Sequence, residues 1–109
     1  MALTKDFRIT VKQRADRDPE FRMGLFTEAM EALLSDDFET GKILLRDYIN
    51  ATIGFPALAR DMQKDAKSLM RMLSASGNPR ADNLLAMIAI LKEQEDLCLA
   101  LTRRQDQAA

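Results

Sequence analysis

The chain of 109 residues contains no histidine, no tryptophan and a single cysteine, Cys98. Without histidine, the general base used by most enzymes is missing, and Cys98 has no partner that would activate its thiol. One cysteine excludes a disulfide within the chain and, with histidine absent, argues against a Cys/His metal site. The four glycines are too scattered to cradle a phosphate group. We therefore expect no enzymatic activity, no metal and no cofactor, and we expect Cys98 to be buried and inert.

Long apolar runs are also missing. No run approaches the ~18 residues that a membrane-spanning helix needs, and the opening "MALTKDFR" lacks the apolar region of a signal peptide. Apolar residues make up 47% of the chain and charged residues 30%, which is a globular mixture. The length suits one domain with a modest core, and a homodimer would add buried surface. We expect a cytoplasmic protein.

Positive and negative charges nearly balance over the whole chain, but they are unevenly distributed along it. The net charge of −1 argues against a globally basic nucleic-acid binder. Residues 60–82 nevertheless carry five basic and three acidic side chains, whereas residues 28–47 carry two basic and six acidic ones. The acidic span could meet a basic protein partner. Alternatively, its carboxylates are solvated helix faces and helix caps.

Apolar residues recur every three or four positions along most of the chain, which predicts an all-α fold. Helices are expected over residues 5–17 and 20–35, from Phe38 to about Thr52, around Leu58 to Met62, over residues 66–73, and from about Asp82 onward. Asp18-Pro19 is a helix-start signal, and Asp36 or Asp37 is expected to cap the helix that follows. In "DLCLALT" the leucines alternate, which predicts a short strand over residues 97–101, with continued helix as the alternative. A lone strand would have to pair with its copy in a second subunit.

The stretch "ALARDMQKDAKSLMRMLSASGNP", residues 57–79, holds two short apolar-periodic runs separated by Gln63-Lys64-Asp65. A three-residue turn between two short helices is typical of a helix-turn-helix motif. The second helix of such a motif needs apolar anchors facing inward and polar side chains facing outward to reach base edges. The candidate DNA-contacting residues are Lys64, Ala66, Lys67, Ser68, Met70, Arg71 and Asn78. The alternative is an ordinary pair of core helices.

The stretch "LARDMQKDAKSLMRMLSASGNPRADNLLAMIAIL", residues 58–91, resembles the lambda-repressor-like (Xre/Cro) helix-turn-helix fold. Within it, Ser68-Leu69 and the "LSASGNP" turn resemble the addiction-module antidote family, the HigA-type antitoxins. This resemblance implies a DNA-binding domain over residues 37–101, an N-terminal helical extension over residues 1–36 and a flexible tail over residues 102–109. One departure is Gln63, where the superfamily favours glycine. A left-handed backbone at a non-glycine residue costs roughly 1 kcal/mol, a cost that a reshaped turn would avoid.

The resemblance also implies a function. It predicts a homodimeric, sequence-specific transcriptional regulator that binds double-stranded DNA and represses its own operon. It further predicts an antitoxin whose partner is a small basic toxin of the RelE/ParE-like class. Two alternatives stay open: a stand-alone Xre-type regulator without a toxin, and a helical protein-interaction module that does not bind DNA.

Overall fold

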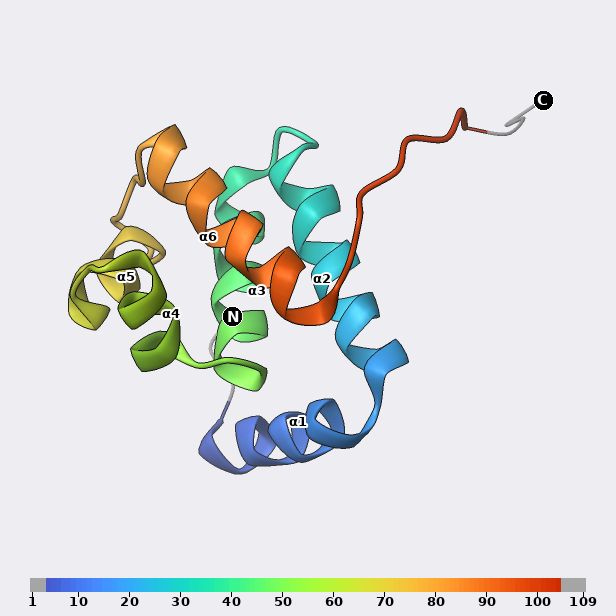
Figure 1. Ribbon diagram of the computed structural model, residues 1–109, viewed down its shortest axis with the longest axis horizontal. Coiled ribbons are helices and arrows are strands. Elements are labelled where there is room, and N and C mark those ends of the chain that lie inside the picture. The colour runs from blue at the N-terminus through green and yellow to red at the C-terminus, as the bar shows by residue number, and fades with distance from the viewer. Residues whose placement is uncertain (1–3, 105–109) are drawn as a thin grey trace.

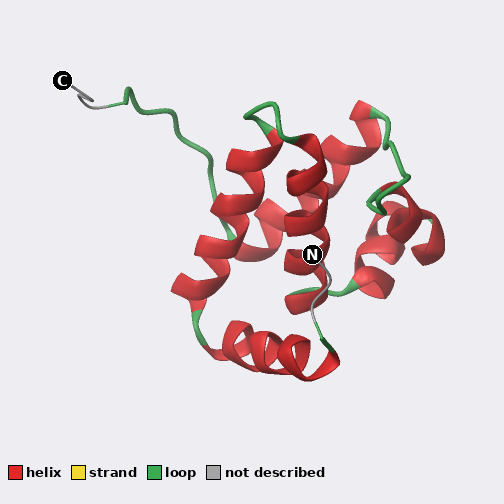
Figure 2. Cartoon of the chain, turned by 180° about the vertical axis from the view of Figure 1, so that it is seen from behind, coloured by secondary structure: helices red, strands yellow, loops and turns green. Residues whose placement is uncertain are grey.

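The computed structural model describes residues 4–104, which form six α-helices joined by short turns (Figure 1). They are α1 (Lys5–Arg17), α2 (Pro19–Leu33), α3 (Phe38–Ala51), α4 (Phe55–Met62), α5 (Ala66–Met72) and α6 (Ala81–Glu95). Between the two ends of this described range every regular element is a helix, and the connections are turns or irregular chain (Figure 2). The prediction of an all-α fold is therefore confirmed.

Short polar side chains start most of these helices. Thr4 accepts a hydrogen bond from the Phe7 amide at 3.1 Å, which caps α1. The carboxylate of Asp18 accepts one from Phe21 at 3.2 Å, and this bond holds the pKa of Asp18 below its usual value. Of the two candidate caps ahead of α3, Asp37 is the one that accepts from a first-turn amide, at 3.3 Å. These bonds satisfy backbone donors that a helix cannot pair internally.

The core lies around α3. Its buried side chains Leu45, Tyr48 and Ile49 contact side chains from α2, α4, α5 and α6 in one apolar cluster. The rings of Phe26 on α2 and Tyr48 on α3 pack with their centroids 5.3 Å apart. Because α2 supplies part of this cluster, residues before position 37 help to build the same core as the residues after it. The cluster members are Phe26, Ala29, Met30, Leu45, Tyr48, Ile49, Phe55, Leu58, Ala59, Leu69, Leu73, Met87 and Leu91.

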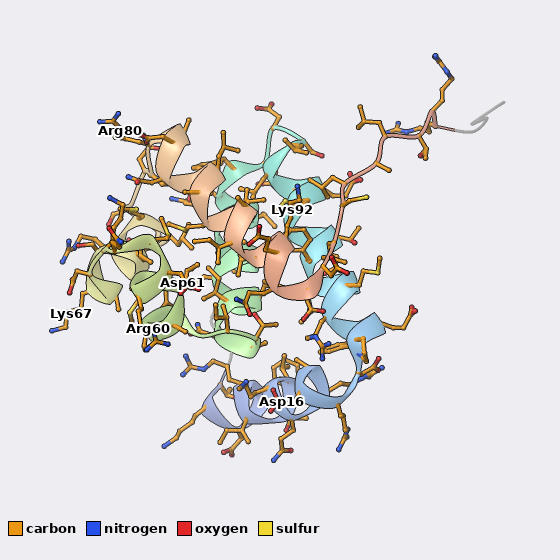
Figure 3. The ribbon with its side chains drawn as sticks, viewed as in Figure 1. Asp16, Arg60, Asp61, Lys67, Arg80 and Lys92 are labelled. Atoms are coloured by element: carbon orange, nitrogen blue, oxygen red, sulfur yellow. The ribbon has the colours of Figure 1, made fainter. Side chains whose placement is uncertain are left out.

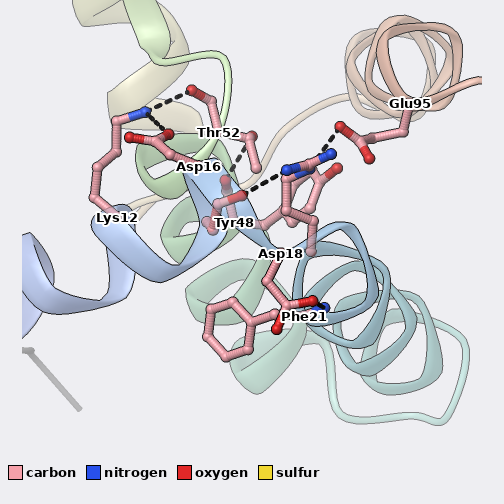
Figure 4. A network of polar contacts seen from close by, with 9 residues as sticks. Lys12, Asp16, Asp18, Phe21, Tyr48, Thr52 and Glu95 are labelled. Atoms are coloured by element: carbon pink, nitrogen blue, oxygen red, sulfur yellow. Dashed lines mark hydrogen bonds and ion pairs between the residues drawn. The ribbon is translucent and has the colours of Figure 1, made fainter.

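A polar network attaches α1 to the rest of the molecule (Figure 4). The ammonium group of Lys12 on α1 contacts Asp16 at 2.9 Å and donates to the Thr52 carbonyl at 3.3 Å. Arg22 on α2 donates to the carbonyl of Ala15 at 2.6 Å and pairs with Glu95 on α6 at 2.8 Å. Together these contacts connect α1, α2, α6 and the end of α3. They surround an open cavity of about 230 Å³.

The C-terminal prediction needs correction. Residues 97–104 form neither the expected strand nor a continued helix, but leave the helical body as irregular chain (Figure 1). The helix ends because Asp96 adopts a left-handed backbone, with φ 55° and ψ 46°. A strand needs a neighbouring strand, and the described part of this chain offers none. For the same reason Cys98, which we expected to be buried, is exposed. Of the predicted tail over residues 102–109, residues 102–104 belong to this irregular chain. Residues 105–109 lie outside the described residues.

None of the helices within residues 4–104 combines the length and the apolar character needed to cross a bilayer.

Candidate nucleic-acid interface

The turn between α4 and α5 keeps the predicted position and length. Helix α4 ends at Met62 and α5 begins at Ala66, so residues 63–65 form the connection. Gln63 adopts a left-handed backbone, with φ 57° and ψ 44°, and its amide donates to the Arg60 carbonyl at 3.1 Å. The amide of Lys64 donates to the Ala59 carbonyl at 2.9 Å. The turn therefore takes the conformation that glycine would adopt most easily, although the residue there is glutamine.

Helix α5 has one face in the core and one face in solvent. Leu69 and Leu73 are buried, and Met72 and Ala66 are partly buried against the same cluster. On the outer face Lys67 and Arg71 are exposed, and Met70 keeps 46% of its surface accessible. Figure 3 shows Lys67 extending from the edge of the molecule, away from α6. Lys67, Met70 and Arg71 are thus open to a partner, whereas Ala66 helps to seat the helix.

Three of the predicted contact residues meet at one hollow in the surface. An open depression of about 420 Å³ is lined by residues of α5 and of the turn that follows it. Ser68 and Arg71 come from the helix, and Asn78 comes from the turn. Ser68 is partly buried, and its amide donates to the Asp65 carboxylate at 3.2 Å. Lys64, also exposed, lies at the other end of the motif in the turn before α5.

The acidic residues of this region are largely engaged. Asp65 caps α5 through the bond to Ser68, and Asp82 pairs with Arg80 at 3.3 Å. Asp61 is exposed, and in the view of Figure 3 it lies farther toward the middle of the molecule than Lys67. Lys64, Lys67 and Arg71 form no ion pair within residues 4–104. The outer face of the motif is therefore locally basic, despite the negative net charge of the chain.

The turn after α5 is held by a residue that sequence reasoning missed. Lys42 on α3 is only 1% exposed, and its ammonium group donates to the carbonyls of Ser74 at 3.0 Å, Ala75 at 3.5 Å and Gly77 at 2.6 Å. It also lies 3.3 Å from the Glu39 carboxylate. These bonds fix the turn that ends in Asn78, and hence one wall of the hollow. The available signal was a lysine placed within the apolar stripe of a helix, where a charge must find partners.

Gly77 is required at this place by close packing. A Cβ atom here would overlap the carbonyl oxygen of Arg71 and would lie 2.6 Å from that of Met72. The backbone of the turn therefore folds directly over the last carbonyls of α5. This contact and the Lys42 bonds explain why the "SGNP" stretch forms a fixed loop.

Several acidic residues of the 28–47 span have local roles, as the alternative to a partner surface predicts. Asp37 caps α3, and Glu39 accompanies Lys42. Asp47 is partly buried, and this burial raises the pKa of its carboxyl group. Glu28 and Glu31 remain exposed on α2. Within the 28–47 span, Glu28 and Glu31 are therefore the exposed carboxylates of α2 that stay as candidates for meeting a basic protein partner.

Comparison with known proteins does not place the chain in a family. No protein-family model matches the chain, no curated protein is similar to it, and no solved structure matches it. Among the described residues no three His, Cys, Asp or Glu side chains gather in a way that could hold a metal ion.

Proposed function

We propose that this protein is a sequence-specific DNA-binding transcriptional regulator of the lambda-repressor-like helix-turn-helix type. Helix α5 is the element that enters the major groove. The proposal is supported above all by the division of α5 into a buried face, with Leu69 and Leu73, and an exposed face, with Lys67, Met70 and Arg71.

Each exposed group has a role in this proposal. Arg71 and Lys67 donate hydrogen bonds to O6 and N7 of guanine, and Met70 offers an apolar contact to a thymine methyl group. Ser68 and Asn78, which share the hollow beside α5, hydrogen-bond to base edges or to the backbone. Lys64 binds a phosphate and sets the position of the motif on the duplex. The remaining predicted residue, Ala66, acts through packing, since it is partly buried.

The modest charge of this surface has consequences for affinity. A single copy has few cations to neutralise phosphates, so it binds weakly, and two linked copies bind far more tightly. A dimer with two-fold symmetry reads two half-sites about one helical turn apart. The dependence of affinity on salt is shallow to moderate because few counterions are released.

Fluorescence anisotropy with a labelled duplex tests this proposal. The duplex carries the DNA upstream of the chain's own gene, and a scrambled duplex of equal length is the control. We expect Arg71→Ala to cost ~1–3 kcal/mol of binding free energy with the upstream duplex. The difference in affinity between the upstream and the scrambled duplex should become smaller. The matched control is Lys92→Ala, which removes a cation from α6, away from Lys67 in Figure 3. If Arg71→Ala binds with unchanged affinity and selectivity, α5 is not the recognition helix.

We further propose that the regulator is the antitoxin of a toxin–antitoxin pair and acts in the cytoplasm. The support is the resemblance of "SLMRMLSASGNPRADNLLAMIAIL" to HigA-type antitoxins. Exposed Glu28 and Glu31 on α2 suit a small basic RelE/ParE-like toxin. Co-purification with the product of the adjacent gene tests this part. The double variant Glu28→Lys, Glu31→Lys should bind that product more weakly than the parent chain. Glu39 is left unchanged, because it lies against the buried Lys42 ammonium group. A chain that binds its operator but captures no neighbouring product is a stand-alone regulator.

A further inference from the structure

The open cavity beside the polar network lies apart from the outer face of α5. Its volume is about 230 Å³, and the residues that line it come from α1, α2, α3, the turn after α3 and α6. Sites for drug-sized ligands usually span ~300–1,000 Å³. The cavity therefore has room for a smaller molecule with only a few functional groups.

The floor of the cavity is apolar, with one polar group set into it. Leu91 and the ring of Tyr48 are buried, and Ile53 is partly buried at the side. These groups suit a short aliphatic chain. The hydrogen bond between Thr52 and Tyr48 uses the Tyr48 carbonyl, at 2.7 Å, so it leaves the phenol hydroxyl free to meet a ligand.

One wall of the cavity carries a guanidinium group that is only partly engaged. Arg22 donates from Nε to Glu95 at 2.8 Å and from Nη1 to the Ala15 carbonyl at 2.6 Å. A guanidinium group has five N–H donors, so Arg22 keeps donors beyond these two bonds. The side chains of Arg22 and Glu95 are each 20% exposed, and partial burial strengthens the attraction between a charge there and its partner.

The opposite side of the cavity carries a carboxylate. Asp16 on α1 contacts the Lys12 ammonium group through Oδ1, at 2.9 Å, and its second oxygen is not part of that contact. Figure 4 shows Asp16 and Glu95 at opposite ends of the network, with Thr52 between them. Since Arg22 pairs with Glu95, its guanidinium group belongs to the Glu95 end. The cavity thus offers an acceptor for a cation at one end and donors for an anion at the other.

We propose that this cavity binds a small aliphatic α-amino acid in its zwitterionic form. The ammonium group of the ligand lies at Asp16, and its carboxylate accepts hydrogen bonds from Arg22 and from the Tyr48 hydroxyl. The aliphatic side chain packs against Ile53 and Leu91. A simple amine would leave the Arg22 donors unused, and a simple carboxylate would leave Asp16 unused. This binding activity goes beyond the proposed function and does not depend on DNA.

Tyrosine fluorescence follows binding at this place directly. Tyr48 is the only tyrosine and the chain has no tryptophan, so the emission comes from a residue that lines the cavity. We expect L-valine to change this emission in a saturable manner. Isobutylamine is valine without its carboxylate, and isovalerate is valine without its amine. Each should bind about tenfold more weakly or worse, because one charge-assisted contact is lost.

Asp16→Asn separates the proposed contact from a general effect on the fold. Asparagine keeps the size of the side chain but removes its charge, and more than half of the Asp16 side chain is exposed, so the helix content should not change. Its affinity for L-valine should fall about tenfold. The matched control is Asp6→Asn, at an exposed position of α1 that does not line the cavity, and it should bind as the parent chain does.

Three results would overturn the proposal. The first is an emission that shows no saturable change with L-valine up to its limit of solubility. The second is equal binding of L-valine and of either single-charge analogue, which would indicate a site for a cation or an anion alone. The third is an Asp16→Asn variant that binds L-valine as tightly as the parent chain. None of these measurements contains DNA, so each result leaves the test of Arg71 unaffected.

Discussion

The ammonium nitrogen of Lys42 lies 2.6 Å from the carbonyl oxygen of Gly77, and this bond ties α3 to the turn that follows α5. The same group also reaches the carbonyls of Ser74 and Ala75. A charge from α3 thus holds the backbone next to the exposed face of α5. Lys42 therefore helps to fix the turn that borders the candidate interface, together with the close packing of Gly77.

Lys42→Met should therefore destabilise the protein. Methionine keeps most of the side-chain volume but leaves the three carbonyls without their charged donor, and the loss of charge-assisted hydrogen bonds costs ~1.5–3 kcal/mol. Urea unfolding followed by circular dichroism measures the change. The matched control is Lys64→Met at an exposed position, where a change within about 0.5 kcal/mol is expected. Equal effects of the two substitutions would show that the buried contacts contribute nothing.

Gly77→Ala should be among the most damaging single substitutions. The added Cβ overlaps the Arg71 carbonyl oxygen, so the turn must move away from α5 at a cost of several kcal/mol, on the order of an overpacked core site. Gly24→Ala is the control, because a Cβ at Gly24 meets nothing within 4 Å inside α2. There the same substitution should stabilise by roughly 0.5–1 kcal/mol. Thermal unfolding of the two variants should give shifts of opposite sign.

Gln63→Gly should stabilise the fold. The left-handed backbone at Gln63 costs a residue with a side chain roughly 1 kcal/mol, and glycine removes this strain. Part of the gain is offset because glycine increases the entropy of the unfolded chain, which leaves about 0.5 kcal/mol. Gln13→Gly, at an exposed position inside α1, should instead destabilise by roughly 0.5 kcal/mol, because glycine is a poorer helix former than glutamine. A loss of stability in Gln63→Gly would mean that the turn has another conformation in solution.

The phenol of Tyr48 should make stability depend on alkaline pH. Burial is the largest cause that raises the pKa of Tyr48, from 10.0 to about 12. Between these two pH values the unfolded chain releases the proton while the folded chain keeps it. The stabilisation is therefore complete below pH 10 and is lost as the pH rises toward 12.

Tyr48 can be followed directly, because it is the only tyrosine and the chain has no tryptophan. The tyrosinate absorbance of the folded protein should titrate well above that of the urea-unfolded chain. In Tyr48→Phe, the part of the alkaline stability loss that comes from this group should disappear. Coincident titrations of the folded and unfolded chains would contradict the burial of the phenol.

Most of the helices and turns could be predicted from short-range patterns in the sequence. Asp18-Pro19 fixed the start of α2, and the apolar spacing of Leu69 and Leu73 distinguished the inner from the outer face of α5. The turn at Gln63 was also predicted, although not that glutamine would accept the left-handed backbone. These features depend on residues a few positions apart, which is why they could be predicted from the sequence.

Contacts between residues far apart in the sequence could not be predicted in this way. Lys42 bonds to carbonyls more than thirty positions away, and backbone acceptors leave no mark in the sequence. The alternation of Leu97, Leu99 and Leu101 indicated a strand, but a strand requires a partner that the described chain does not contain. The exposure of Cys98 follows from the same missing partner.

The central claim is that the outer face of α5 meets duplex DNA, and amide chemical shifts test it most directly. The nitrogen-labelled chain is titrated with the duplex that carries its upstream region, and shifts are mapped onto the structure. The account predicts the largest changes at Lys64, Lys67, Met70, Arg71 and Asn78, with little change at Glu28 and Glu31 on α2. Changes confined to residues outside α4, α5 and the turn after α5, or no changes at all with this duplex, would contradict it.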